Sequence, residues 1–422
     1  MNKSLKRRTF LRQGGAALAA PFILPRRGFA QDSSPNDRIV MGAIGVGGRG
    51  TYNMTNFLGR SEVQMVAACD VYEPHRERAR LRVNDRYGNE DCASYNDFRE
   101  LLDRDDIDAV CVGTPDHWHT LINVYAAQTG KDIYSEKPLT LVIDEGRILV
   151  NAVRRYGRVF QVGSQQRSSW NFRYACELVR SGKLGNIHTV TAFLPSGPTA
   201  EWPEMPQEVP EGLDWDMYLG PAKWVPYMRQ RTFWDFRWFF DYSGGQMTDW
   251  GAHHFDIAQW GLGMDESGPV KIKGTATRPQ DGPYETFIHF DVEFEYANGI
   301  KMIGTNPEHG TKFEGSEGWV HVWRGGLDAE PKDLLEETIG PNDVHLYESN
   351  DHHGNFLDCV RTRQRPICDV ETGHRSVTCA HLANIACKLG RELRWDPERE
   401  VFIGDEQANE MRFRPYRAPW YL

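Results

Sequence analysis

The first half of the chain alternates short apolar runs with stretches in which apolar and polar residues mix. The runs are continuously apolar, which is typical of strands buried on both faces of a parallel sheet. The mixed stretches predict helices, including 98–103, 121–129 and 144–156. Strands that alternate with helices indicate a doubly wound α/β domain. The predicted strands are residues 38–44, 62–69, 107–112, 131–135 and 159–162.

The second half has a different period. Residues 288–296 place an apolar residue at every second position, with His, Asp and Glu between them. This alternation predicts an antiparallel strand with one buried side, and Asn298-Gly299 after it indicates a hairpin turn. Further strands are predicted at 270–277, 300–305 and 319–323, and helices at 171–181, 348–361 and 374–389.

A glycine-rich turn follows the first predicted strand. Its sequence, Gly45-Val-Gly-Gly-Arg-Gly50, fits the pattern G-x-G-x-x-G. The first glycine allows a tight turn, Gly47 lets the backbone approach a pyrophosphate, and the third lets the next helix pack closely. The second strand ends at Asp70, where an acid binds the adenosine ribose. The pattern predicts a dinucleotide site that prefers NAD to NADP, with Arg49 either on a phosphate or at the surface.

Polar residues also follow the later strands of this domain. Ligands of open α/β sheets bind beyond the carboxyl ends of the strands, so residues at these ends are candidates for a cofactor site. A histidine at such an end is otherwise a hydrogen-bonded loop residue. The candidates are Thr114, His117, His119, Glu136 and Lys137.

A second candidate group lies on one predicted helix, for which Thr248 is a suitable cap. Asp249 and His253 are four residues apart and share one face, together with Asp256. A carboxylate one turn from a histidine orients the ring and raises its proton affinity, which suits a general base. A structural Asp–His pair is one alternative. A metal site that adds His254 is another, although its ligand set is incomplete.

Aromatic residues crowd the region between the two predicted domains, from Trp202 to Trp250. Their faces fit the C–H faces of sugar rings, and nearby polar groups bind hydroxyls; a core or a subunit interface is the alternative use of these rings. The predicted substrate-binding residues are Gln166, Arg167, Arg237, Trp238 and His254.

Composition and charge exclude several classes of protein. The chain has 422 residues, enough for two domains, and a formal net charge of −10. Such a chain repels phosphate groups, which argues against nucleic acid and anionic membranes as partners. No apolar run reaches the ~18 residues that span a bilayer.

The first thirty residues differ from the rest, because they contain seven basic residues and no acid. Arg7 and Arg8 precede Phe10 and a mild apolar stretch, and Gly28 and Ala30 fit a cleavage site. We predict a twin-arginine export signal, with a basic amphipathic helix as the alternative, and hence a periplasmic or otherwise exported protein handled by the twin-arginine translocase. This route carries folded proteins, which suggests a bound cofactor.

The eight cysteines show no C-x-x-C pair and no zinc spacing. Cys69 and Cys111 lie inside apolar runs and are predicted to be buried. A chain that folds in a reducing compartment needs no disulfides. Two bridges stay possible from the spacing, namely Cys359–Cys368 and Cys379–Cys387.

Over about residues 38–420 the chain resembles the glucose–fructose oxidoreductase, inositol dehydrogenase and rhizopine-catabolism (Gfo/Idh/MocA) family, most closely its exported, Trp-rich branch. The resemblance rests on the glycine pattern, Thr114-Pro115 with His119, Glu136-Lys137-Pro138, Gly244-Gly245, and Asp249 with His253.

The resemblance implies a Rossmann domain followed by an α/β domain with an open, mostly antiparallel sheet, often used to form dimers or tetramers. It also implies that Lys137, Asp249 and His253 are catalytic, and that a cis Lys137–Pro138 peptide fixes the lysine near the nicotinamide. The predicted parts are a signal peptide (1–30), a Rossmann domain (31–163), a substrate and oligomerisation domain (164–394) and a tail that packs on the domain surface or a neighbouring subunit (395–422).

Three functions follow as alternatives. The first is an NAD-dependent oxidoreductase that acts on a secondary hydroxyl of a sugar or sugar derivative. Its NAD is tightly bound and recycled, because an exported protein has no free NAD pool. The second is a redox-neutral glycosidase that oxidises C3, eliminates the C1 substituent, adds water and reduces the ketone. The third is a non-catalytic, NAD-bound sugar sensor, which the intact Lys137, Asp249 and His253 disfavour.

Overall fold

The computed structural model describes residues 37–200 and 205–422, so the predicted export signal and Trp202 lie outside the described residues. Its first sheet has six parallel strands in the order β3-β2-β1-β4-β5-β6, which confirms the doubly wound domain. The strand order reverses between β1 and β4, where such folds bind ligands. The strands are β1 (Ile39–Ile44), β2 (Val63–Cys69), β3 (Ala93–Tyr95), β4 (Ala109–Val112), β5 (Asp132–Ser135) and β6 (Phe160–Val162).

The continuous apolar runs form strands because both faces of this sheet are covered. On β4, Ala109 and Cys111 pack into one hydrophobic cluster, whereas Val110 and Val112 pack into another. All four residues are buried. The helices of this domain are α2 (Gly48–Leu58), α3 (Glu73–Tyr87), α4 (Phe98–Leu102), α5 (Asp116–Gln128) and α6 (Ile143–Arg155).

The second sheet has nine strands in the order β13-β12-β11-β7-β10-β9-β8-β14-β15. Only β7 and β10 pair in parallel within it, so the predicted mostly antiparallel sheet is confirmed. Phe290, Val292 and Phe294 are buried while His289 and Asp291 are exposed, as the alternation predicts. The strands are β7 (Ile187–Phe193), β8 (Lys271–Thr277), β9 (His289–Glu295), β10 (Lys301–Thr305), β11 (Gly310–Gly315), β12 (Gly318–Trp323), β13 (Gly326–Glu330), β14 (Leu393–Asp396) and β15 (Val401–Phe402).

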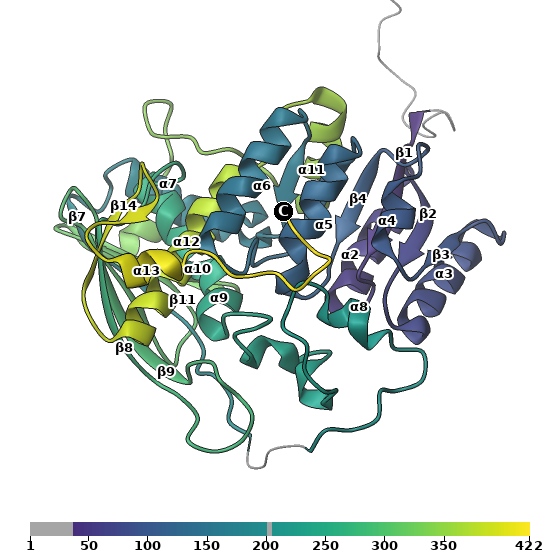
Figure 1. Cartoon of the computed structure of the whole chain (residues 1–422). Helices are drawn as coiled ribbons and strands as arrows, with labels where there is room; N and C mark the ends of the chain where they lie inside the picture. Colours follow the sequence, from purple (N-terminus) through teal and green to yellow (C-terminus); the bar gives the residue numbers. More distant parts are fainter. Residues whose placement is uncertain (1–36, 201–204) are drawn as a thin grey trace, which may run out of the picture. The chain divides into compact units, whose positions relative to one another are not determined.

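A layer of helices packs on one face of this sheet, with α10 against α7, α12, β7 and β11 (Figure 1). Phe255 of α10 contacts Phe294 of β9 edge to face, which joins the layer to the sheet. The helices are α7 (Trp170–Arg180), α8 (Trp215–Leu219), α9 (Gln246–Asp249), α10 (Gly251–Leu262), α11 (His352–Thr362), α12 (Val370–Leu389) and α13 (Glu406–Glu410). Short 3-10 turns are η2 (Gln165–Ser168), η3 (Arg229–Arg231), η4 (Asp235–Trp238) and η5 (Lys332–Leu335).

Late parts of the chain complete the first domain. Phe356 and Leu357 of α11 belong to the same hydrophobic cluster as β1 and β2. The segment after α13 runs back to α5 and α6 (Figure 1). There the Arg414 guanidinium donates to Glu145 Oε1 at 2.8 Å, and the Trp420 ring meets Trp118 with centroids 4.8 Å apart. The predicted tail (395–422) is therefore divided. Trp395, Phe402 and Ala408 belong to the core of the second domain, whereas the residues after α13 pack on the first domain of their own chain.

The structure also shows the state of the cysteines and the length of the helices. Cys69 and Cys111 are buried, as predicted, and all eight cysteines are free. The two disulfide bridges suggested by the spacing are therefore absent. Within residues 37–200 and 205–422, no helix is long and apolar enough to cross a membrane.

Candidate functional site

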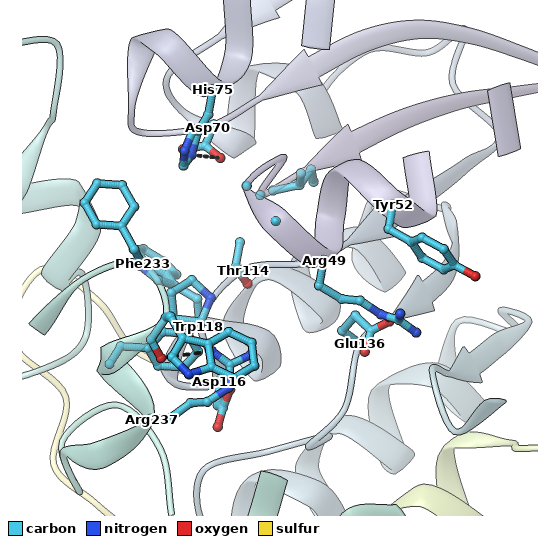
Figure 2. Close-up of a pocket in the computed structure, with 18 of the residues that line it drawn as sticks. Arg49, Tyr52, Asp70, His75, Thr114, Asp116, Trp118, Glu136, Phe233 and Arg237 are labelled. Atoms are coloured by element: carbon cyan, nitrogen blue, oxygen red, sulfur yellow. Dashed lines mark hydrogen bonds and ion pairs between the residues drawn. The ribbon is translucent and has the colours of Figure 1, made fainter. Parts of the chain in front are cut away.

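A cavity of about 1020 Å³ opens at the carboxyl ends of β1, β2, β4 and β5. Its walls come from both domains (Figure 2). Of the predicted site residues, eleven line it: Gly45, Gly47, Arg49, Asp70, Thr114, Glu136, Lys137, Gln166, Arg237, Asp249 and His253. The sequence patterns therefore meet in one place, although they are spread over more than two hundred residues.

The glycine loop forms the tight entry to α2. Gly45 has φ +74°, and a Cβ there would lie 2.6 Å from Thr114 N, so the turn requires glycine. A Cβ on Gly50 would lie 1.7 Å from Gly45 O, which shows how closely α2 approaches the loop. Gly48 has no atom within 4 Å of its added Cβ and lines the cavity. The open N-terminus of α2 suits the pyrophosphate of a dinucleotide.

Asp70 lies at the end of β2, on the cavity edge beside His75 (Figure 2). Its carboxylate accepts hydrogen bonds from Val46 N and Tyr72 N, both at 2.9 Å, and lies 3.5 Å from His75 Nδ1. These contacts fix an acidic group next to the glycine loop. That is the arrangement that binds the ribose hydroxyls of NAD and repels the 2′-phosphate of NADP.

Glu136 gathers donors at the floor of the cavity. Its Oε1 accepts from Arg49 Nε at 2.9 Å, Asn53 Nδ2 at 2.7 Å and Gln165 Nε2 at 3.2 Å. Burial opposes ionisation, but the Arg49 charge and the hydrogen bonds lower the pKa of Glu136. Arg49 is therefore held by Glu136 and by the Tyr52 ring, 4.5 Å from its guanidinium carbon, at the cavity wall (Figure 2).

Lys137 and Asp249 form the polar centre of the cavity wall. Lys137 Nζ donates to Asp249 Oδ1 at 2.5 Å and to the Asp249 carbonyl at 3.0 Å. Arg237 Nε lies 3.5 Å from the same carboxylate oxygen. Burial raises the pKa of Asp249, but the Lys137 and Arg237 charges outweigh it and the net shift is downward. The Lys137–Pro138 peptide is cis, as the family resemblance implies.

His253 is buried in the first turn of α10 and lines the cavity. Within the described chain its Nδ1 has no hydrogen-bond partner. Burial and the nearby charges of Lys137 and Arg324 lower its pKa well below 6.5. The ring is therefore neutral near pH 7 and can accept a proton.

Two expectations about this helix are wrong. Thr248 is not the helix cap: it lies inside α9, where its hydroxyl bonds Gly245 O and Gly244 N, and α10 starts only after Trp250. The carboxylate of Asp249 turns to Lys137 and does not raise the proton affinity of His253, whose pKa is lowered.

The metal alternative also fails. Asp256 is bound by Arg167, and His254 packs against the Trp250 ring rather than toward a shared centre. Among residues 37–200 and 205–422, no group of three His, Cys, Asp or Glu is placed to hold a metal ion.

Three predicted cofactor residues do not line the cavity. His117 is buried, and its Nε2 bonds Tyr218 O at 3.0 Å. His119 is held between Pro138 O at 2.7 Å and Thr114 O at 2.9 Å. Both are thus hydrogen-bonded histidines of helix α5. Gly50 serves the packing of α2, as described above.

Three predicted substrate residues are also turned away. Arg167 is 1% exposed because Asp256 and Asp265 surround its guanidinium. Trp238 and His254 are buried outside the cavity wall. Arg167 and His254 were predicted from their polar groups and Trp238 from its aromatic face, but each is part of the packed interior.

Sequence reasoning missed two charged residues of the wall. Asp116 at the start of α5 accepts from Ser243 Oγ at 2.5 Å, and burial raises its pKa to about 6. Arg324, between β12 and β13, lies over the Trp250 ring at 4.6 Å. Gln166 links Arg324 to His253, because its side-chain amide donates to His253 O at 3.1 Å and accepts from Arg324 Nε at 3.3 Å. Asp116 directly follows Thr114-Pro115, which was the available signal.

The fold and the cavity together define a two-domain oxidoreductase with a dinucleotide site. A family model described as "Oxidoreductase family, NAD-binding Rossmann fold" matches residues 39–164, and one described as "Oxidoreductase family, C-terminal alpha/beta domain" matches residues 193–422. The chain belongs to the Gfo/Idh/MocA oxidoreductase family, and its cofactor is NAD.

Known proteins resemble the chain to different extents. It is 26% identical over 340 residues to scyllo-inositol 2-dehydrogenase (NAD(+)) of Bacillus subtilis, covering 77% of this chain and 86% of that one. It is 32% identical over 158 residues to a glycosyl hydrolase family 109 protein of Solibacter usitatus, covering 36% of each. The chain spans 34% to 58% of the length of several other relatives. In fold it is similar to aldose-aldose oxidoreductase from Caulobacter crescentus, with a TM-score of 0.63, 18% identity, and 85% and 99% of the two chains covered.

Replacing Asp70 with alanine is expected to weaken NAD binding by roughly 10- to 100-fold, the scale of losing hydrogen bonds to a charged acceptor. It should also narrow the preference for NAD over NADP, because the acid that repels a 2′-phosphate is lost while Arg76, whose Nη1 donates to Asp70 O at 3.3 Å, remains. Titration of both nucleotides measures the ratio of dissociation constants. Asp70→Asn, which keeps the shape, separates the charge from the packing; an unchanged ratio in both variants contradicts the assignment.

Proposed function

We propose that the protein oxidises a secondary hydroxyl of a sugar or sugar derivative with NAD that stays bound between turnovers. The observation that carries the proposal is the convergence of Lys137, Asp249 and His253 on the cavity that also holds the glycine loop and Asp70. Bound NAD supplies the acceptor for the hydride that leaves the substrate carbon.

The residues of the wall divide the remaining work. The neutral His253 ring takes the hydroxyl proton as the hydride leaves. The Lys137 ammonium stabilises the negative charge that develops on the substrate oxygen. Asp249 holds that ammonium in place at 2.5 Å, and Gln166 bonds the backbone of His253.

Two observations support a hydroxylated ring as the substrate, namely the side chains that line the cavity and the name of one related protein. Tyr52 and Trp250 present aromatic surface to the cavity, and Gln165, Gln166 and Arg324 present polar groups. Such a mixture suits a ring with hydroxyls on its rim and C–H groups on its faces. The Bacillus subtilis relative is named for a cyclic polyol, scyllo-inositol, which has this character.

We include the recycling of NAD in the proposal because the first thirty residues have the pattern of a twin-arginine export signal. Outside the cytoplasm, bound cofactor must return to its starting redox state in every turnover. The test incubates purified protein with a panel of sugars and glycosides, without added NAD. The first sugar should raise the absorbance at 340 nm, and the absorbance should decay once a second substrate with a carbonyl group takes the hydride back from the bound NADH. The oxidised and reduced products should then exceed the bound cofactor many times over. Turnover that needs stoichiometric NAD in solution contradicts recycling.

The redox-neutral glycosidase is the second candidate, favoured by the glycosyl hydrolase family 109 relatives. In it a ketone at C3 acidifies the C2 hydrogen, so that the C1 substituent is eliminated before water adds. Mass spectrometry of the panel separates the two functions. A glycosidase releases free sugar from a 3-hydroxyl glycoside and fails on the 3-deoxy analogue, whereas an oxidoreductase yields an oxidised sugar.

His253→Ala is expected to lower kcat at least ~10²-fold while NAD stays bound, because a positioned base is lost. In the wild type the basic form exists above the pKa of His253, which lies well below 6.5. Activity that depends on this ring is therefore retained at pH 6.5 and lost only as the pH falls further. The pH profile of kcat/KM checks the sign, with His188→Ala on the exposed face of β7 as the control. Near-normal turnover in His253→Ala removes it from the base role.

A further inference from the structure

Three aromatic rings stand beside Asp70 at the edge of the cavity. Tyr72 and His75 come from the start of α3, and Phe233 comes from the second domain, between η3 and η4. The ring centroids are 4.9 Å apart for Tyr72 and His75, 5.7 Å for Tyr72 and Phe233, and 5.8 Å for His75 and Phe233. Figure 2 shows Phe233 close to His75, on the same edge of the cavity as Asp70. We call Tyr72, His75 and Phe233 the aromatic clasp.

The backbone holds Phe233 in an unusual conformation. Its φ is +54°, in the left-handed region that bulky residues rarely adopt. Such conformations persist where the surroundings fix them, and they cluster at ligand sites. Here Thr232 is buried, its hydroxyl donates to Arg229 O at 2.7 Å, and Asp235 N donates to Thr232 O at 3.1 Å. The turn presents the Phe233 ring to the cavity.

The two sides of the clasp are also tied together behind Asp70. Asp214 N of the second domain donates to Val71 O at 2.9 Å, and Glu73 N donates to Gly212 O at 2.8 Å. The segment that leads toward Phe233 is thus bound to the residues directly after Asp70. The adenosine end of the cavity is therefore built by both domains.

Phe233 is 42% exposed, although it lines the cavity and is wholly apolar. With Tyr72 and His75 it forms a contiguous aromatic surface on the cavity, and contiguous exposed surface of this kind marks ligand-binding sites. Asp70 fixes which part of NAD lies there, because it is the ribose acid, whereas Lys137 and His253 mark the nicotinamide end. The neighbour of that ribose is adenine, whose flat face packs well on aromatic rings.

We propose that the aromatic clasp binds the adenosine half of NAD and slows its release, so that the cofactor stays with the protein. The assignment rests on the proposed function for the need to retain NAD. Phe233 has the central part, because it is the member supplied by the second domain. Opening the clasp requires that the turn at Phe233 move away from Tyr72 and His75.

The experiment measures release of NADH from full-length protein preloaded with it. Excess NAD serves as the trap, and NADH fluorescence reports the release rate. Phe233→Ala is expected to release NADH at least about tenfold faster than the wild type, the scale of losing one aromatic contact to a base. The matched control is Trp224→Ala, an aromatic that is 56% exposed on the same segment but does not line the cavity. It should release NADH at the wild-type rate. Release from Phe233→Ala within twofold of the wild type overturns the proposal.

A second variant separates the ring from the backbone. Phe233→Gly suits the positive φ and removes the ring. A folded Phe233→Gly protein should match Phe233→Ala, and wild-type release from it overturns the proposal even where Phe233→Ala fails to fold.

Failure of the clasp and failure of the proposed function are distinguishable, because the release measurement uses no sugar. If the purified wild type holds no NAD, recycling fails. The clasp is then tested by comparing the dissociation constants of added NAD for the wild type and Phe233→Ala. A weaker affinity in Phe233→Ala supports the clasp, and equal constants overturn it. If release is unchanged while sugars are still turned over, the clasp alone is wrong.

Discussion

Replacing Lys137 with alanine is expected to lower the turnover rate at least ~10²-fold while leaving NAD bound. The lysine supplies positive charge where negative charge develops on the substrate oxygen, and no other cation of the wall bonds Asp249 as closely: Arg237 Nε is 3.5 Å away, against 2.5 Å for Lys137 Nζ. Single-turnover measurements of NADH formation separate this chemical step from product release.

The same substitution changes the acid beside it. Without Lys137 the carboxylate of Asp249 loses the charge that contributes most to lowering its pKa, so that pKa should rise. The Lys137 charge also lowers the pKa of His253, so the acid limb of the residual rate is expected to move to higher pH. Lys183→Ala, which removes a lysine paired with Glu337 outside the cavity, is the matched control. Turnover of Lys137→Ala within threefold of the wild type excludes the lysine from the reaction.

Arg167→Met is expected to lower the free energy of unfolding by about 3–5 kcal/mol, because it leaves buried carboxylate without its partner. Both Asp256 oxygens accept from Arg167 at 2.8 Å, and the Arg167 and Asp256 side chains are each 1% exposed. Burial already raises the pKa of Asp256. Denaturant unfolding, monitored by tryptophan fluorescence, measures the loss.

An exposed pair offers the comparison. Arg365 lies 4.0 Å from Glu266, with the two side chains 69% and 82% exposed. Arg365→Met should change stability by less than about 1 kcal/mol. If Arg167 bound substrate directly, its loss would reduce turnover and leave stability unchanged. That outcome would restore the role that the sequence suggested.

The sequence predicts the first domain well because its signals are local. Buried parallel strands are continuously apolar, and the glycine turn and Asp70 follow their strands directly. The sequence does not predict helix α3. Only its residues Ala79, Val83 and Asn84 are buried, and most of its other residues are charged. A helix that contributes so narrow a stripe to the core leaves little apolar pattern to detect.

At the candidate site, the sequence does not predict contacts between residues that are distant in the chain. Spacing placed Asp249 and His253 on one helix and paired them. The chain instead divides at Trp250 into α9 and α10, and Asp249 pairs with Lys137 from the other domain. Local spacing carries no information about that contact, whereas the family resemblance identified both residues.

Burial is the other property that spacing does not report. Arg167 and His254 carry polar groups that suit a site, yet packing of the second domain encloses them. Phe233 and Arg324, in contrast, lie between regular elements, where no periodicity marks them. Only the completed fold brings their loops to the cavity wall.

The contribution of late residues to the first domain affects how the protein is made. Trp118 and Phe98 are covered by Trp420, and the β1 cluster includes Phe356 of α11. A ribosome adds about 5–20 residues per second, so the stretch from β6 to Trp420 takes roughly 10–50 s to synthesise. During that time the nascent first domain exposes apolar surface that its own chain has yet to supply. The domain translated first is therefore completed last, and chaperones have that interval in which to bind it.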